Sequence, residues 1–358
     1  MTICRVLDWV ENLVNIFISY TGQDIREGIG TITGLYFNSF QSRAGIISSA
    51  IGRDIEGIKR CLDAGESIDS KDNSGKTALM HASLNSDFDI VKLLLERGAD
   101  VKITDEFGET ALSKAATKGN LDIIKLLISS GAAVDSSNNF GKTPLANAFR
   151  NNRFEVALLL IENWANIRTV DKQGNNLLIT ASTSCDETAL KFLLEAGIGL
   201  EERNAMGQTA LMVAAINGNK NAVKFLISRG AEKNVFDAGG TPITIAAFKT
   251  YDATVATLLI ESGANVNARN KEGDTLLIIA AATSRVDFIK YLIEKGADIN
   301  AVNNSGKSVL EAVKGNAEAM GFLTSYIAKI NKFKEIEARG AKRLERLQRN
   351  IGRKKVKL

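Results

Sequence analysis

The sequence is poor in several residue types on which catalysis and cross-linking depend. Its 358 residues include one histidine, two prolines and three cysteines. A single histidine, His81, excludes metal sites built from several histidines, and it leaves Ser-His or Cys-His catalysis only if His81 itself serves. The cysteines, Cys4, Cys61 and Cys185, lie far apart without a CxxC pair, so they predict neither a disulfide framework nor a zinc site. This usage fits a reducing compartment, and we expect a cytoplasmic protein.

Long apolar runs are also absent. The stretches without charge near the N-terminus, residues 12–23 and 28–42, are too short to span a bilayer. The apolar segment at the N-terminus contains Asp8 and Glu11, which argues against a secretory signal. With 45% hydrophobic and 24% charged residues, the composition is that of a globular protein and excludes disorder of the whole chain.

Glycine, by contrast, is abundant and recurs with a fixed period of 33 residues. One series comprises Gly75, Gly108, Gly141, Gly174, Gly207, Gly240, Gly273 and Gly306. A second comprises Gly65, Gly98, Gly131, Gly197, Gly230, Gly263 and Gly296, with Trp164 in the one missing position. A leucine series has the same period: Leu94, Leu127, Leu160, Leu193, Leu226, Leu259 and Leu292. Three series with one period indicate a repeat protein.

Each unit reads as a turn followed by two helices. Residues 72–75 have the Asp and Gly of a tight turn, and Thr77 then suits a helix N-cap. The next position is the first helical residue, where proline is tolerated, and we place both Pro144 and Pro242 there. A second helix with apolar residues at helical spacing ends at Gly98, which favours a left-handed helix end.

These units resemble ankyrin repeats. The family's motifs appear in residues 141–145 (Gly-Lys-Thr-Pro-Leu), 263–267 (Gly-Ala-Asn-Val-Asn) and 296–300 (Gly-Ala-Asp-Ile-Asn). The resemblance implies an all-α ankyrin-repeat solenoid of helix-turn-helix units with β-turn fingers. The histidine that the family usually has in the first helix is missing, and His81 falls one position later.

The period divides the chain into seven clear repeats and two degenerate ones. The clear repeats are residues 72–104, 105–137, 138–170, 171–203, 204–236, 237–269 and 270–302. Residues 39–71 and 303–330 are degenerate, as capping repeats of a solenoid are expected to be, and the latter puts Ser325 in the leucine position. We therefore expect an N-terminal amphipathic helical extension (1–38), an ankyrin repeat domain (39–330) and a basic C-terminal tail (331–358).

The two ends of the chain leave alternatives open. Residues 3–18 have an apolar helical stripe that either caps the array or binds a partner or a membrane surface. Residues 329–358 carry 12 Lys or Arg and 3 Glu, a net charge of +9, whereas the whole chain has +4. Residues 331–350 could continue a helix, and we expect residues 352–358 to be loose. The tail is either a solvated end, a nuclear-import signal, or a contact for nucleic acid, acidic protein or anionic lipid.

Catalytic, cofactor and metal sites are not predicted. The Gly-Lys-Thr triplet at residues 75–77 resembles the end of a P-loop, but Ser70 stands where the earlier glycine is needed. The segments outside the repeats are too short for a catalytic domain. We therefore expect a protein that is not an enzyme.

The resemblance implies recognition of a partner protein by the fingers and the face of the first helices. The expected contacts are Asn73, Ser74, Lys76, Glu106, Phe107, Glu109, Asn139, Phe140, Lys142, Lys172, Gln173, Met206, Gln208, Lys271, Glu272 and Asp274. Phe107 and Phe140 are either exposed anchors or packed against neighbouring fingers. Similar arrays occur in cytosolic adaptors of eukaryotes and in secreted effectors of host-associated bacteria, and we expect a monomer or a member of a hetero-complex.

Overall fold

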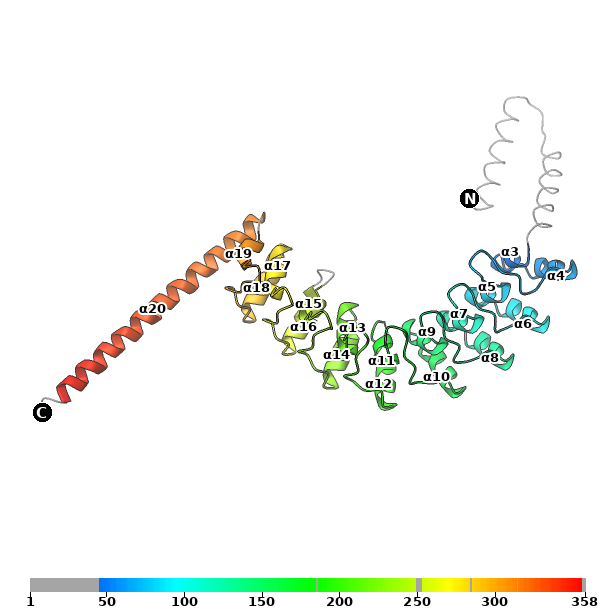
Figure 1. Cartoon of the computed structure of the whole chain (residues 1–358), viewed down its shortest axis with the longest axis horizontal. Helices are drawn as coiled ribbons and strands as arrows, with labels where there is room; N and C mark the ends of the chain where they lie inside the picture. The colour runs from blue at the N-terminus through cyan, green and yellow to red at the C-terminus, as the bar shows by residue number, and fades with distance from the viewer. Residues whose placement is uncertain (1–44, 185, 249–252, 284, 314, 356–358) are drawn as a thin grey trace, which may run out of the picture. The chain divides into compact units, whose positions relative to one another are not determined.

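The computed structural model describes residues 45–184, 186–248, 253–283, 285–313 and 315–355. The expected N-terminal extension, residues 1–38, lies outside these described residues. The chain divides into two compact units, Met1–Asn139 and Phe140–Leu358. In each unit, short helices follow one another in pairs, with the predicted fingers between the pairs (Figure 1).

The first unit contains three described helix pairs. They are α3 (Ile46–Ile51) with α4 (Ile55–Asp63), α5 (Ala78–Asn85) with α6 (Phe88–Glu96), and α7 (Ala111–Lys118) with α8 (Leu121–Ser129). We call the first helix of each pair the inner helix and the second the outer helix. As predicted, threonines cap the inner helices: the hydroxyls of Thr77 and Thr110 accept hydrogen bonds from the backbone N–H three residues later. Gly98 and Gly131 follow the outer helices at φ +87° and +88°, the left-handed conformation expected of them.

The core of this unit lies between the paired helices. The inner helix α7 contributes small residues, and both Ala115 and Ala116 are fully buried. The outer helix α8 buries Ile123, Ile124 and Leu127. Alanines on one helix and branched aliphatic residues on the next let the backbones approach closely without leaving voids. All members of the leucine series, in both units, have no exposed surface.

The second unit continues the same arrangement of helix pairs. Its helices are α9 (Pro144–Arg150), α10 (Phe154–Glu162), α11 (Leu177–Ala181), α12 (Glu187–Glu195), α13 (Ala210–Ile216), α14 (Lys220–Ser228), α15 (Ile243–Ala246), α16 (Ala253–Glu261), α17 (Leu276–Ala282), α18 (Val286–Glu294), α19 (Val309–Ala312) and α20 (Ala317–Lys355). Isolated β-bridges join the two sides of three fingers, at Phe236–Pro242, Arg269–Thr275 and Val302–Ser308.

Both glycine series have the backbone conformation that their spacing predicts. Every glycine of the turn series and of the helix-end series has a positive φ. Trp164, which replaces glycine after α10, adopts the same conformation at φ +67°. The helix end is therefore kept, although a residue with a Cβ is strained there.

The position predicted for Pro242 is wrong. Pro144 is the first residue of α9, as expected, but Pro242 precedes α15, which begins at Ile243. Pro242 stands 33 residues after the capping Thr209, so the helix start keeps the repeat period. Its φ of −68° and ψ of 150° are extended, and it pairs with Phe236 in a β-bridge. Proline has no backbone N–H, and Pro242 stands at a position where no N–H donor is needed.

The last helix departs from the repeat pattern. α20 has 39 residues and runs without a break through the expected boundary at residues 330 and 331. It buries Leu323 against α18 and α19, while Ser325, in the leucine position, is exposed. The helix includes Gly352 and ends at Lys355, so the expectation that residues from 352 onward are loose is wrong up to that point. Lysine and arginine are good helix formers and are favourable at a helix C-terminus.

Candidate partner-binding surface

The first polar residue of each finger closes the turn from inside. The Oδ1 atom of Asp105 accepts hydrogen bonds from the backbone N–H groups of Phe107 and Glu109, both at 2.9 Å. In the second unit, Oδ1 of Asn204 accepts from Met206 at 3.0 Å and Gln208 at 2.9 Å. An aspartate and an asparagine therefore build the same finger, because the turn uses only one oxygen of each.

Backbone hydrogen bonds tie neighbouring fingers together within each unit. In the first unit, Glu106 N–H donates to the Ser74 carbonyl at 3.1 Å. In the second, Lys172 donates to Phe140 at 2.9 Å and Ala205 to Gln173 at 2.8 Å. The turn glycines permit this approach, since a Cβ on Gly75 would lie 2.9 Å from the Glu106 nitrogen. The finger tips that these bonds join therefore form a row within each unit.

The expected contact residues fall into two groups. Those at the tips are exposed: Asn73, Glu106, Phe107, Asn139, Phe140, Lys172, Gln173, Met206, Lys271 and Glu272. The second group is only partly exposed. It consists of Ser74, which precedes its turn glycine, and of the residues that follow a turn glycine: Lys76, Glu109, Lys142, Gln208 and Asp274.

Two members of the second group, Asp274 and Glu109, contact the finger beside them. Asp274 accepts a hydrogen bond from the Asn303 amide at 2.8 Å, and Glu109 accepts one from the Asn138 amide at 3.3 Å. These side chains support the fingers, so they are less available to a partner than the tip residues.

The apolar tip residues have about half of their surface exposed. The values are 51% for Phe107, 54% for Phe140 and 51% for Met206. Phe107 also accepts a backbone hydrogen bond at its carbonyl from Asn139 at 2.9 Å, which holds its main chain in place. Large apolar side chains held on a rigid backbone are suited to act as anchors in an interface.

A second row of residues, which the sequence pattern alone did not predict, lies immediately before the first polar residue of each finger. In the second unit it reads Val170, Arg203, Phe236, Arg269 and Val302, and we call it the alternating row. The apolar members are 58%, 41% and 46% exposed, and both arginines are exposed. The 33-residue period would have revealed it, because these residues share one repeat position.

The arginines of the alternating row are held by the fingers next to them. Nη1 of Arg203 donates to the carbonyls of Gly207 at 2.7 Å and Phe236 at 2.8 Å. Nη1 of Arg269 donates in the same way to Val302 at 2.7 Å. A guanidinium group has five N–H donors, so these bonds orient each arginine without using its whole donor set.

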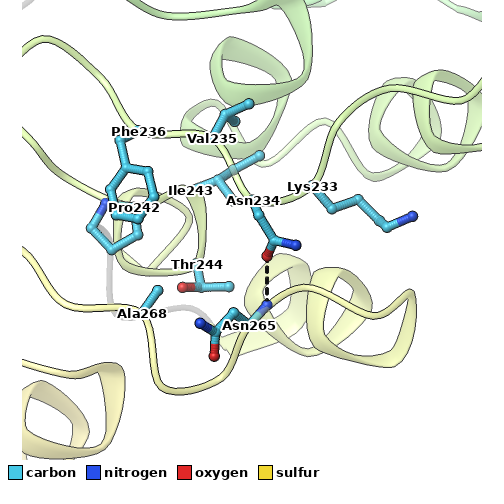
Figure 2. Close-up of a pocket in the computed structure, with 9 residues that line it drawn as sticks. All are labelled: Lys233, Asn234, Val235, Phe236, Pro242, Ile243, Thr244, Asn265 and Ala268. Carbon is cyan, nitrogen blue, oxygen red and sulfur yellow. Dashed lines mark hydrogen bonds between the residues drawn. The ribbon is translucent and has the colours of Figure 1, made fainter.

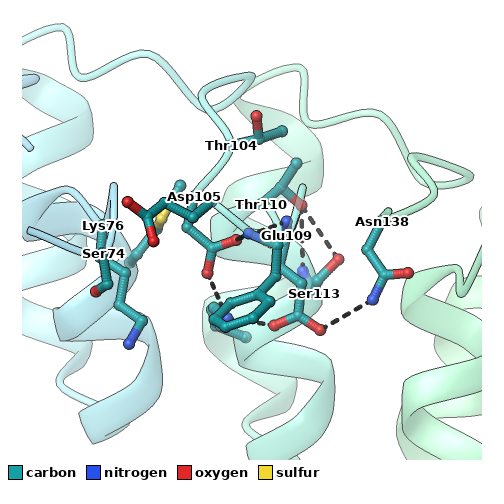
Figure 3. Close-up of polar contacts among 12 residues, drawn as sticks. Ser74, Lys76, Thr104, Asp105, Glu109, Thr110, Ser113 and Asn138 are labelled. Atoms are coloured by element: carbon teal, nitrogen blue, oxygen red, sulfur yellow. Dashed lines mark hydrogen bonds and ion pairs between the residues drawn. The ribbon is translucent and has the colours of Figure 1, made fainter. Parts of the chain in front are cut away.

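A polar side-chain contact between finger and inner helix also recurs at the repeat period in the first unit. Nε2 of His81 lies 2.8 Å from Oδ2 of Asp72, and Nζ of Lys114 lies 2.8 Å from Oδ2 of Asp105. Lys114 also pairs with Glu109. Glu109 in turn accepts a hydrogen bond from the Asn138 amide (Figure 3). The shared spacing of the two pairs in the sequence would have revealed them.

These contacts shift two ionisation equilibria. Burial alone would raise the pKa of Asp72, but hydrogen bonds from His81 and from the backbone of Lys76 and Ser74 outweigh it and hold that pKa well below its ordinary value. Burial would lower the pKa of Lys114, yet its bonds with Asp105 and Glu109 outweigh this effect and raise it. The pair of Lys114 with Asp105 and Glu109 is therefore charged near neutral pH, and the contacts of Asp72 and Lys114 both connect the fingers to the inner helices.

One hollow of the second unit lies at the base of a finger and is small. Its volume is about 50 Å³, far below the roughly 300 Å³ of the smaller ligand pockets. Figure 2 shows Phe236 beside Pro242, with Thr244 and Ala268 among the other residues that line it. The Thr244 hydroxyl is buried and has no hydrogen-bond partner within the described part of the chain. The hollow has room for a methyl-sized group or a water molecule, but not for a cofactor.

Among the described residues, no group of three or more His, Cys, Asp or Glu is placed to hold a metal ion. No helix among the described residues is both long and apolar enough to cross a membrane.

Stacked helix pairs with rigid fingers define a helical repeat protein. Family models assign it more closely: a model of three ankyrin repeats matches residues 98–171, 159–237 and 243–334, and a model of many ankyrin repeats matches residues 61–115. The chain belongs to the ankyrin repeat family, whose repeats are generally modules for protein-protein interaction. No curated protein matches the sequence.

Proposed function

We propose that the array is a non-enzymatic scaffold that binds a partner protein through its finger and inner-helix face. The observation that carries this proposal is the alternating row of the second unit. Val170, Phe236 and Val302 expose large apolar surfaces at one repeat position, with Arg203 and Arg269 between them. Regular exposure of this kind leaves apolar area in water that a partner would cover.

The chemistry of the row favours an extended partner segment with alternating character. Apolar side chains of the partner would cover the valines and Phe236, and carboxylates between them would pair with the arginines, for which planar bidentate contacts are favourable. The two sides of a finger are extended segments, and at the usual spacing of paired extended segments, about 4.8 Å, one repeat advances roughly 10 Å. An extended chain rises about 3.3 Å per residue, which places apolar and acidic partner residues roughly three positions apart.

The exposed tip residues extend this surface within each unit. Lys172, Gln173 and Met206 lie on fingers joined by backbone hydrogen bonds in the second unit, and Phe107 lies on such a finger in the first. The support for a non-catalytic role is that every family model that matches the chain, between residues 61 and 334, is a model of ankyrin repeats.

The experiment is capture of partners from an extract of the source cells by the full chain, followed by identification by mass spectrometry. Binding of each identified protein is then measured with Val170→Asp/Val302→Asp, which puts two carboxylates into the alternating row. The matched control is Phe88→Asp, since Phe88 is 39% exposed but begins an outer helix, away from the fingers.

We expect the double substitution to weaken binding by at least tenfold and the control to leave it unchanged. Two valine side chains covered by a partner contribute more than the 1.4 kcal/mol that a factor of ten represents, and a charged carboxylate at either position removes that contribution. Equal binding by the double variant, or equal weakening in the control, would show that the row is not the binding surface.

A further inference from the structure

The last helix continues far beyond the part that packs on the array. Ala319 and Leu323 of α20 are buried, and the helix contacts α18 and α19. Every side chain that the structure describes between Asn331 and Lys342 is exposed, and Ile336 is 57% exposed. Most helical stability in proteins comes from packing of an apolar face. A helix of this length that makes no such contact within the chain would be stabilised by a contact with another molecule.

The sequence of this segment is that of a basic amphipathic helix. Apolar residues recur at three- and four-residue spacing in two groups, at positions 330, 333 and 336 and at positions 344, 347 and 351, and the groups are eight residues apart, about two helical turns. Positions with this spacing fall on one side of a continuous helix. The basic residues Lys332, Arg339 and Lys342 stand at positions on the other side, and residues 329–358 have a net charge of +9. An apolar stripe opposite a cationic face is typical of helices that lie in a membrane interface.

We infer that α20 beyond Ile330 binds the surface of an anionic lipid bilayer. In this arrangement the apolar stripe enters the boundary between headgroups and acyl chains, and the cationic residues contact lipid phosphates and carboxylates. The helix lies on the bilayer and does not cross it, because no described helix is apolar enough to span. This membrane contact is independent of the binding of a partner protein by the fingers.

Charge and length favour this occupant over the others. A second copy of the helix would bring two segments of net charge +9 together. A nucleic acid would neutralise the charge but would leave the apolar stripe in water. A groove in an acidic protein typically holds anchors over i to i+7, whereas this stripe runs from Ile330 to Ile351, about 32 Å at 1.5 Å per residue. A flat bilayer surface accommodates a straight helix of that length.

The test is co-sedimentation of the full chain with vesicles. One vesicle population contains phosphatidylcholine with one third phosphatidylserine, and the other contains phosphatidylcholine alone. We expect binding to the first and at least tenfold weaker binding to the second, with loss of binding to the anionic vesicles at high salt. Circular dichroism of the same samples should show increased helix content on binding.

Two variants separate the charged face from the apolar stripe. Arg339→Glu/Lys342→Glu removes two cations, each worth a factor of about five near an anionic surface, so partitioning should fall at least 25-fold. Ile336→Glu should lower it at least tenfold by placing a charge in the stripe. The matched control, Lys220→Glu/Lys224→Glu, makes the same charge change at exposed positions of α14 and should bind like the unaltered chain.

Three results would overturn the inference. They are the absence of vesicle binding, equal binding to both vesicle populations, and an equal loss in the α14 control. In the first case, the same proteins assayed by sedimentation equilibrium and with a duplex oligonucleotide would show whether a second copy or a nucleic acid takes the place of the lipid. Failure of this test leaves the finger surface unaffected, because capture of a partner protein is measured separately.

Discussion

Replacement of Lys114 by methionine tests how the fingers are attached to the inner helices. The Lys114 side chain is 9% exposed and that of Asp105 is fully buried, and their charged atoms are 2.8 Å apart. Removal of the lysine leaves the Asp105 carboxylate buried beside Glu109 with no cation. Loss of one partner of a buried ion pair costs about 3–5 kcal/mol, and methionine keeps most of the apolar stem, so we expect destabilisation in that range.

The compensating variant is Asp105→Asn/Lys114→Met, which removes both charges. Asn204 shows that an asparagine at this position closes its finger with the same two backbone hydrogen bonds. We therefore expect the double variant to be about 2 kcal/mol more stable than the single one, because no unpaired carboxylate remains at residue 105.

The assay is urea unfolding of the full chain followed by circular dichroism. Hydrogen exchange of the segment 105–129 locates the effect, since a repeat array can open in parts. A second check is alkaline pH. The pKa of Lys114 is raised, so the pair contributes stability at neutral pH that is lost as pH rises through that raised value, and Lys114→Met should remove this loss. A single variant as stable as the unaltered chain, or a double variant no more stable than the single, would refute the reasoning.

Two further predictions concern backbone strain and acid stability. Trp164→Gly should stabilise the chain by about 0.5–1 kcal/mol in urea unfolding, because Trp164 is 91% exposed and has a φ of +67°. Gly131→Ala, at φ +88°, should destabilise the chain by about 1 kcal/mol. A loss of stability in Trp164→Gly would contradict this reasoning. The lowered pKa of Asp72 means that its contribution is complete above pH of about 4 and is lost as pH falls below it. Asp72→Asn should therefore flatten the dependence of stability on pH between about 4 and 2, and an unchanged acid slope would show that Asp72 does not carry it.

Much of the fold follows from local chemistry that can be read in the sequence. The glycine series predicts positive φ at both the turn and the helix end, since only glycine adopts that conformation without strain. Thr77 and Thr110 predict helix starts, because a hydroxyl at that position satisfies an N–H that has no helical partner. Pro242 shows the limit of this approach. The Thr-Pro motif at residues 241 and 242 stands one residue earlier in its repeat than the motif of the other repeats, but α15 still begins where the 33-residue period places it.

Parts of the candidate surface depended on contacts between repeats. The tip positions were predicted from the turn motif, and ten of the expected residues are exposed. The alternating row and the Lys114 ion pair were not predicted, although the residues of both recur at the repeat period in the sequence. That these side chains are exposed or paired is decided by the stacking of units and the fold of a finger onto its helix. Exposure of Phe107 could not be read from its position either, because a residue before a turn glycine can point to solvent or to the next finger.

The sequence by itself determined the repeat period, the family and the positions of the turns, because each of these depends on residues close together in the chain and on the recurrence of their spacing. The tertiary structure decided which side chains are buried and which are presented. Lys114 is buried between two carboxylates, and Trp164 is exposed at a strained helix end. α20 extends beyond the helices on which its first turns pack. Burial depends on which neighbours each repeat meets, and that is a property of packing between units, which local spacing does not contain.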